Sequence, residues 1–241
     1  MPATRTPYAD WVRACTVAET VGMTAAAVAA VAGRSLGTAA ALALVVTGGL
    51  VEGLALGWAQ GHVLGRLAPA LDRRRYLLVT VLVAGVGWAG ASAPAAFAGD
   101  SDATQPALGI VVLSAAGLGL VMGAVLGSAQ AAVLRGAVRR PWRWVAVNAA
   151  AWPPAMAVIF LGATTPSASW PDWAVVALGP VTGMAAGGVL GIVSGGFLPT
   201  LAGGRREEVP TTTDLGPCPA DRPPQEAGNH PRRRSLSLIH I

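Results

Sequence analysis

Charge is scarce in this chain: only 12% of its residues are charged, against about 25% in an average soluble domain. Lysine is absent, and all 17 basic residues are arginine. Although the net charge is +5, the arginines stand in connecting segments rather than on a patterned face, which argues against nucleic-acid binding. The hydrophobic content of 53% indicates an integral membrane protein instead.

Cysteine and catalytic motifs are also scarce. The two cysteines, Cys15 and Cys218, stand at opposite ends of the chain, which excludes a disulfide framework and a cysteine-rich metal site. The sequence contains no H-E-x-x-H motif, no phosphate-binding loop, and no serine, histidine and aspartate arrangement. We therefore predict a protein that is not an enzyme and that uses no cofactor and no metal.

Long hydrophobic runs are what the chain has in abundance. A helix needs about 20 mostly apolar residues to cross the hydrocarbon core of a bilayer. Six stretches are long enough, and the sequence predicts an all-α integral membrane protein with six transmembrane helices. These stretches are approximately 14–33, 38–65, 76–98, 107–134, 144–163 and 173–200.

The arginines predict the orientation of these spans. By the positive-inside rule, the loops and ends that carry arginine face the cytoplasm. We therefore expect a multi-pass protein of the plasma (inner) membrane, with both termini cytoplasmic. The opposite loops carry Asp100, Asp102 and Asp172, and Arg34 is the exception among them. The cytoplasmic arginines are Arg5, Arg13, Arg66, Arg73, Arg74, Arg75, Arg135, Arg139, Arg140, Arg143, Arg205 and Arg206.

Tryptophans agree with this orientation, because indole rings anchor helices at membrane interfaces. Trp11, Trp142 and Trp144 fall at the expected inner interface, and Trp170 and Trp173 fall at the outer one. An alternative interpretation treats the first span as a signal peptide, with 30–32 as a small-residue cleavage site. Glu19 interrupts the apolar run and the next span follows at once, which favours a membrane helix.

The chain divides into three parts by composition. Residues 1–13 form a cytoplasmic N-terminal segment, and 14–202 form the transmembrane domain. Residues 203–241 are rich in proline, threonine and mixed charge, so we expect a disordered cytoplasmic tail. Its last residues, 235–241, look like translated adapter sequence and carry no functional weight.

Glycine recurs at every fourth position in the second, fourth and sixth spans. Such stripes weaken a helix in water by about 1 kcal/mol per glycine, but they let helices approach closely in a bilayer. We expect glycine-zipper packing on these three helices, with the first, third and fifth more peripheral. The stripes are Gly49, Gly53, Gly57, Gly61 and Gly65; Gly119, Gly123 and Gly127; and Gly179, Gly183, Gly187, Gly191 and Gly195.

The stripes belong to an internal repeat. Residues 53–64 align without a gap to 123–134 in the pattern G-x-x-L-G-x-A-Q-x-x-V-L, and a weaker copy begins at Gly187. All copies run in the same direction, which predicts three parallel-repeat helical hairpins, about 14–66, 76–135 and 144–200. The pattern resembles a loose group of uncharacterised bacterial multi-span proteins with L-G-x-x-Q-x-x-V-L helix ends. That resemblance implies no function.

Glu52 departs from the repeat, because the equivalent positions hold Met122 and Ala186. It lies near the centre of the second span, where a carboxyl group must be protonated, paired or facing water. One interpretation makes Glu52 a proton or cation site at the bilayer midplane. The other makes it a neutral carboxylic acid that hydrogen-bonds across a helix interface.

A second set of polar residues shares one depth near the inner boundary, counted from the nearest arginine. Their common depth predicts an interhelical hydrogen-bond network, with Glu19 and His62 as a candidate charge pair. The structural alternatives are an interfacial carboxylate at a wet helix end and glutamines that bond across close glycine contacts. The set is Glu19, Gln60, Gln130, Asn148 and His62.

These observations favour a role in moving a small solute or ion across the membrane, with Glu52 as the principal polar site. The alternative is a non-catalytic scaffold or assembly factor whose glycine faces bind partner membrane helices or a second copy. Both interpretations take the lipid bilayer as the surroundings, and neither involves nucleic acid. They differ in what Glu52 faces: transport requires a water-accessible cavity, whereas a scaffold predicts a packed interior.

Overall fold

A computed structural model describes residues 6–97, 107–167 and 169–199. These residues form six α-helices that are each long and apolar enough to cross a membrane, which confirms the predicted all-helical membrane fold. The expected spans match the helices to within a few residues, except that the first helix begins earlier, at Pro7, and the sixth ends earlier, at Gly195. The helices are α1 (Pro7–Gly33), α2 (Thr38–Leu67), α3 (Arg73–Phe97), α4 (Leu108–Leu134), α5 (Arg143–Thr164) and α6 (Asp172–Gly195).

Local chemistry explains where several helices begin. The hydroxyl of Thr6 accepts a hydrogen bond from the Ala9 amide, and Pro7 occupies the first turn of α1, where its missing N–H costs nothing. Before α3, the Asp72 carboxylate accepts from two backbone amides of the first turn, each at 3.1 Å. Within α5 the helix continues through the pair Pro153 and Pro154.

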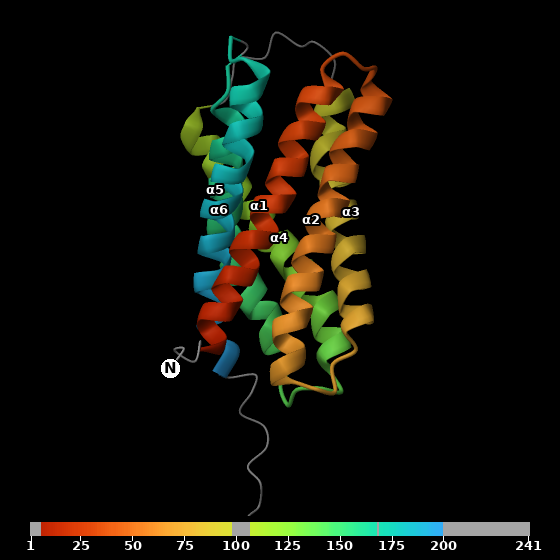
Figure 1. Cartoon of the computed structure of the whole chain (residues 1–241), viewed down its shortest axis with the longest axis vertical. Coiled ribbons are helices and arrows are strands. Elements are labelled where there is room, and N and C mark those ends of the chain that lie inside the picture. Colours follow the sequence, from red (N-terminus) through yellow and green to blue (C-terminus); the bar gives the residue numbers. More distant parts are fainter. Residues whose placement is uncertain (1–5, 98–106, 168, 200–241) are drawn as a thin grey trace, which may run out of the picture. The chain divides into compact units, whose positions relative to one another are not determined.

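The six helices are arranged in a ring. Each packs mainly against its neighbours in the sequence, and α6 closes the ring by packing against α1, which is the most extensive contact of all (Figure 1). None of the six described helices stands at the centre (Figure 1). The expected division into packed spans 2, 4 and 6 and peripheral spans 1, 3 and 5 is therefore wrong, because a ring gives every helix two neighbours.

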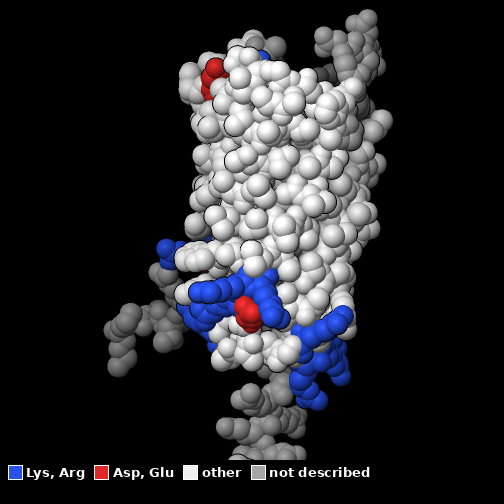
Figure 2. Space-filling model, turned by 90° about the vertical axis from the view of Figure 1, so that its right-hand side faces the viewer, with Lys and Arg blue, Asp and Glu red and all other residues white. Residues whose placement is uncertain are grey.

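Arginine gathers at one end of this ring, here called the arginine end. It comprises the start of α1 and the connections from α2 to α3 and from α4 to α5 (Figure 1). On the face shown in Figure 2, blue arginine side chains crowd this end, and a broad band without charge lies above them. At the opposite end, Arg34 pairs with Asp172, so the arginine that departed from the orientation pattern is neutralised by α6. The predictions for 1–5, Asp100, Asp102 and 200–241 concern residues outside the described ones.

Each glycine stripe lies against the helix that follows it around the ring. A methyl group placed on Gly53 would meet α3, with the Ala84 Cβ at 2.7 Å. One placed on Gly123 would lie 2.9 Å from the Asn148 carbonyl carbon of α5. One placed on Gly191 would lie 2.7 Å from the Val12 Cα of α1. These helix pairs therefore approach to a distance that leaves no room for a side chain at the glycine.

The arginine end of the ring is filled by a packed cluster to which α1 to α5 all contribute. At its centre the rings of Trp11 and Trp144 meet edge to face, with centroids 5.5 Å apart. Tyr76 and Leu134 of the same cluster are also fully buried. Large apolar side chains elsewhere, such as Leu82 and Val86, point away from the ring and are more than half exposed, as expected of a surface that faces lipid.

Candidate functional site

A cavity of 740 Å³ lies inside the ring, toward the end opposite the arginines. All six helices line it, and its walls reach from the turn at Leu36 to Leu56 and Leu126 in the middle of the ring. This volume is within the range of about 300–1,000 Å³ that small-molecule sites occupy. The packed cluster at the arginine end lies beyond the floor of the cavity.

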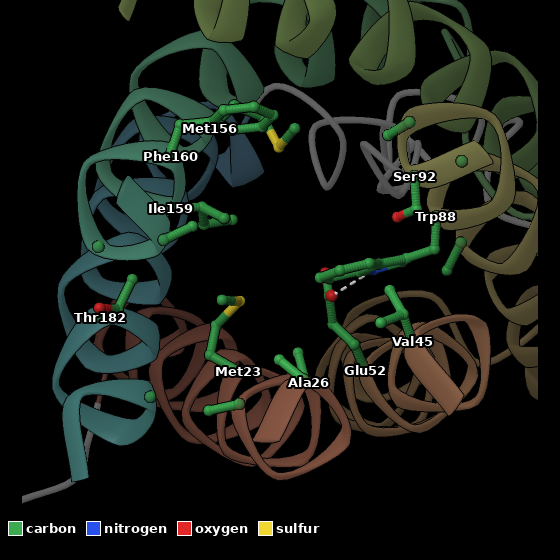
Figure 3. A pocket seen from close by; sticks show the side chains of 18 of the residues that line it. Met23, Ala26, Val45, Glu52, Trp88, Ser92, Met156, Ile159, Phe160 and Thr182 are labelled. Carbon is green, nitrogen blue, oxygen red and sulfur yellow. Dashed lines mark hydrogen bonds between the residues drawn. The ribbon is translucent and has the colours of Figure 1, made fainter. Parts of the chain in front are cut away.

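Glu52 is one of the residues that line this cavity (Figure 3). Its side chain leaves α2, and its Oε2 accepts a hydrogen bond of 2.7 Å from the indole N–H of Trp88 on α3. Figure 3 shows this pair on one side of the hollow, with Met156 and Ile159 of α5 across from it. A third neighbour is Gly22 of α1, where an added methyl group would lie 2.5 Å from the Glu52 Cγ.

The close approach at Gly22 and the bond to Trp88 hold the carboxyl group from two sides. Glu52 is 5% exposed, so the protein packs around its stem. A residue larger than glycine at position 22 would displace the carboxyl, because the clash involves the Glu52 backbone as well as its side chain. The sequence does not identify Trp88 as the partner of Glu52. The one available signal is that an indole N–H at mid-membrane depth must find an acceptor there.

A polar network lies between the cavity and the arginine end, and two of the predicted glutamines are at its centre. Gln60 accepts a hydrogen bond of 3.0 Å from the Tyr76 hydroxyl. Gln130 accepts one of 2.8 Å from the indole N–H of Trp144 and donates one of 3.0 Å to the Thr80 hydroxyl. A longer bond of 3.4 Å joins the two glutamine amides directly. Gln130 is fully buried.

The glutamine network contacts the cavity wall on one side and Cys15 of α1 on the other. Thr80 also lines the cavity, so the same hydroxyl belongs to the cavity wall and to the glutamine network. On the other side, the Gln60 amide nitrogen donates to the Cys15 thiol at 3.7 Å. The predicted network exists for Gln60 and Gln130, and the residues missing from the prediction are its aromatic and hydroxyl partners.

The aromatic donors of this region follow one another around the ring. Tyr76 of α3 donates to Gln60 of α2, and Trp144 of α5 donates to Gln130 of α4. In α6, Ser194 stands at the position that aligns with the glutamines, and it accepts a hydrogen bond of 2.8 Å from the indole of Trp11 in α1. Each of the three aligned acceptors thus accepts a hydrogen bond from an aromatic side chain of the next helix around the ring.

Trp11 and Trp144 are therefore not interfacial anchors. Both lie at the arginine end as expected, but both are fully buried and use their N–H groups inside the protein. Trp142, in contrast, is 52% exposed and stacks beneath the Arg135 guanidinium, with the cation 4.6 Å from the ring centroid. Trp173 at the opposite end is also exposed.

Glu19 does not join the glutamine network. Its side chain is 1% exposed, and neither carboxylate oxygen has a hydrogen-bond partner among the described residues. It lies one turn of α1 beyond Cys15 and one turn before Gly22, within electrostatic reach of Glu52. Because Gly22, one turn along α1 from Glu19, lies against Glu52 of α2, two carboxyl groups that the sequence placed at different depths belong to neighbouring turns of adjacent helices.

The other two predicted site residues are elsewhere. Asn148 is buried and bonds within its own helix, donating to the Trp144 carbonyl at 2.9 Å and accepting from the Trp152 indole at 3.3 Å. His62 is exposed on the outside of α2, where it stacks on Trp58 with ring centroids 5.9 Å apart. The predicted pairing of His62 with Glu19 is absent, because the two side chains point to opposite sides of the ring wall.

Comparisons of this chain with protein-family models, with curated proteins and with solved structures yield no match.

Proposed function

We propose that this membrane protein moves a small solute across the bilayer and that the cavity that reaches Glu52 is its binding site. The observation that carries the proposal is a cavity walled by all six helices, with a carboxyl group in its wall. Beyond the cavity floor, the buried aromatic cluster closes the arginine end. A site that is closed at one end of the protein is a feature of one of the two states that alternating access requires.

The carboxyl pair supports this proposal. Ionisable residues inside a membrane are costly, and they mark substrate or proton pathways where they face a cavity. Glu52 lines the cavity, and the buried carboxyl group of Glu19 on the adjacent helix has no hydrogen-bond partner among the residues that the structure describes. The proposed role of Glu52 is to bind solute or proton, and that of Glu19 is to exchange a proton with it.

We also infer that the three hairpins are copies of one unit. The inference is supported by the aligned acceptors Gln60, Gln130 and Ser194, because each receives a bond from the next helix. The glycine stripes of α2, α4 and α6 lie at the same three seams, between one hairpin and the next. On this view the three helix contacts, α2–α3, α4–α5 and α6–α1, are equivalent, and Glu52 makes the first of them suitable for binding a ligand.

The scaffold alternative is less well supported. It requires glycine faces that are free to receive a partner helix, but the stripe glycines in α2, α4 and α6 lie against α3, α5 and α1 of the same chain. A partner helix or a second copy would have to bind an outer face of the ring. An interior packed throughout, which the scaffold predicts, also disagrees with a cavity of 740 Å³.

The transport proposal is tested with purified protein in proteoliposomes. We expect the wild type to move at least one member of a broad panel of ions and small solutes, and Glu52→Gln to lose most of that flux. Asp10→Asn is the matched control: it removes a carboxylate from a surface ion pair with Arg66, outside the cavity, and surface pairs contribute about 0–1 kcal/mol. A wild type that moves nothing on the panel would refute the proposal.

We further propose that the arginine end is cytoplasmic. Cys15 is fully buried and will not react in the folded protein, so a new thiol is needed on each side. In a Cys218→Ser background, Ser167→Cys should react with a membrane-impermeant maleimide on intact cells. Ala70→Cys should react only after permeabilisation, because Ala70 is exposed at the arginine end. The reverse pattern of labelling would invert the topology.

A further inference from the structure

The walls of the cavity are mostly apolar, and this limits what can bind there. Aliphatic and sulfur side chains such as Met23, Val45, Met156 and Ile159 face the hollow (Figure 3). A small hydrated ion that entered would lose water without gaining enough polar partners, which is costly in an apolar environment. The walls therefore favour a ligand that carries its own apolar surface.

The charge of the cavity has one sign. Within the described part of the chain, the lining residues include no arginine and no histidine, and Glu52 is their single ionisable group. A carboxyl group in an apolar wall must be protonated, paired or facing water, and its charged form without a counter-charge is strongly unfavourable. The protein supplies only the Trp88 N–H, so a cationic ligand would provide the missing charge.

Aromatic surface accompanies the carboxyl group. The indole of Trp88 reaches over Glu52, and Phe160 and Trp152 contribute further rings to the walls. Aromatic faces attract cations through the quadrupole of the ring, most strongly where water is excluded. A carboxylate beside aromatic rings therefore suits a cation whose charge is covered by apolar groups.

We propose that the cavity binds lipophilic organic cations, with Glu52 as the counter-charge and Trp88 as the aromatic wall that holds Glu52 in place. This inference rests on the proposed function, because it takes the same cavity as the binding site and names the class of ligand. An anion of the same size and shape would meet the carboxylate and be repelled. A neutral apolar molecule would fill the volume but leave the carboxylate without its counter-charge.

The test compares two ions of nearly identical shape and opposite charge, tetraphenylphosphonium and tetraphenylborate. Equilibrium binding of each is measured on the purified wild-type protein, on Glu52→Gln and on the Asp10→Asn control. We expect the phosphonium ion to bind the wild type and the control alike, and Glu52→Gln to weaken its binding at least about tenfold. The borate ion should not bind measurably to any of them.

Equal binding of both ions, or binding of neither, would overturn the ligand class, and this comparison on the wild type needs no variant to fold. A phosphonium affinity that is the same in Glu52→Gln would overturn the role of Glu52. The flux measurements separate the two proposals. Glu52-dependent flux of another solute without phosphonium binding would refute the ligand class alone. Phosphonium binding without any flux would refute transport alone.

Discussion

Replacing Gly187 with alanine is expected to destabilise the folded protein by about 1–3 kcal/mol, which is what an added methyl group typically costs in a packed interior. The new methyl would lie 2.6 Å from the Cys15 carbonyl oxygen and 2.7 Å from the Thr16 Cα of α1. Both atoms belong to the backbone, so no side chain can rotate away. The two helices would have to separate along the seam that closes the ring.

The adjacent glycine provides the control. Gly188 is also in α6, but a methyl group there would find its nearest atom, the Thr16 Oγ1, at 4.0 Å. Gly188→Ala should therefore fold as well as the wild type. The readout is the temperature at which each purified variant loses its monodisperse peak in size-exclusion chromatography. If both substitutions lower that temperature equally, close packing at the α1–α6 seam is not what requires Gly187.

Gln130→Leu is expected to lower the free energy of unfolding by about 1–3 kcal/mol, because it keeps the side-chain volume but removes the amide at the centre of the buried network. The Trp144 N–H would lose its acceptor, and the Thr80 hydroxyl would lose its donor. Hydrogen bonds between membrane helices average about 0.6 kcal/mol each, and the loss of a buried partner adds to that value.

Ser128→Ala is the matched control for this network. Ser128 is exposed on the same helix, and its hydroxyl donates to the Ala124 carbonyl of its own turn. Unfolding with increasing denaturing detergent, followed by tryptophan fluorescence, should show a lower midpoint for Gln130→Leu and an unchanged one for Ser128→Ala. A Gln130→Leu midpoint equal to that of the wild type would show that the network does not stabilise the ring.

The helices themselves are predictable from the sequence, because the membrane requires long apolar runs and places charge between them. Hydropathy and the position of charge are properties of each residue alone. The contact partner of a residue depends instead on how the helices are arranged. That Glu52 meets Trp88 depends on the rotation of two helices about their axes, which no single span determines.

Depth is a second property that counting residues does not fix. Arg13 suggests where the first span begins, but α1 begins at Pro7, so Arg13 lies well inside the helix. Cys15 rather than Glu19 consequently meets Gln60, and Gly22, one turn beyond Glu19, meets Glu52. The buried Trp11 has the same cause, since it sits in the second turn of a helix that extends further than its apolar run.

The cavity could not be predicted, because it is a property of the closed ring rather than of any helix. Its walls take residues from every helix, and most of those residues are ordinary apolar side chains. Glu52 stands out in the sequence because it breaks the repeat. The cavity beside Glu52 forms only when α6 has packed against α1, so the sequence of a single helix does not reveal it.

The closure of the ring by its first and last helices has a consequence for biosynthesis. α1 is made before the other five described helices, yet its most extensive contact is with α6, which is made after them. Until then, the face of α1 that carries Glu19 has no partner, and no shorter nascent chain contains a complete cavity. Membrane insertion can therefore proceed span by span, whereas the complete cavity forms only after α6 has been made.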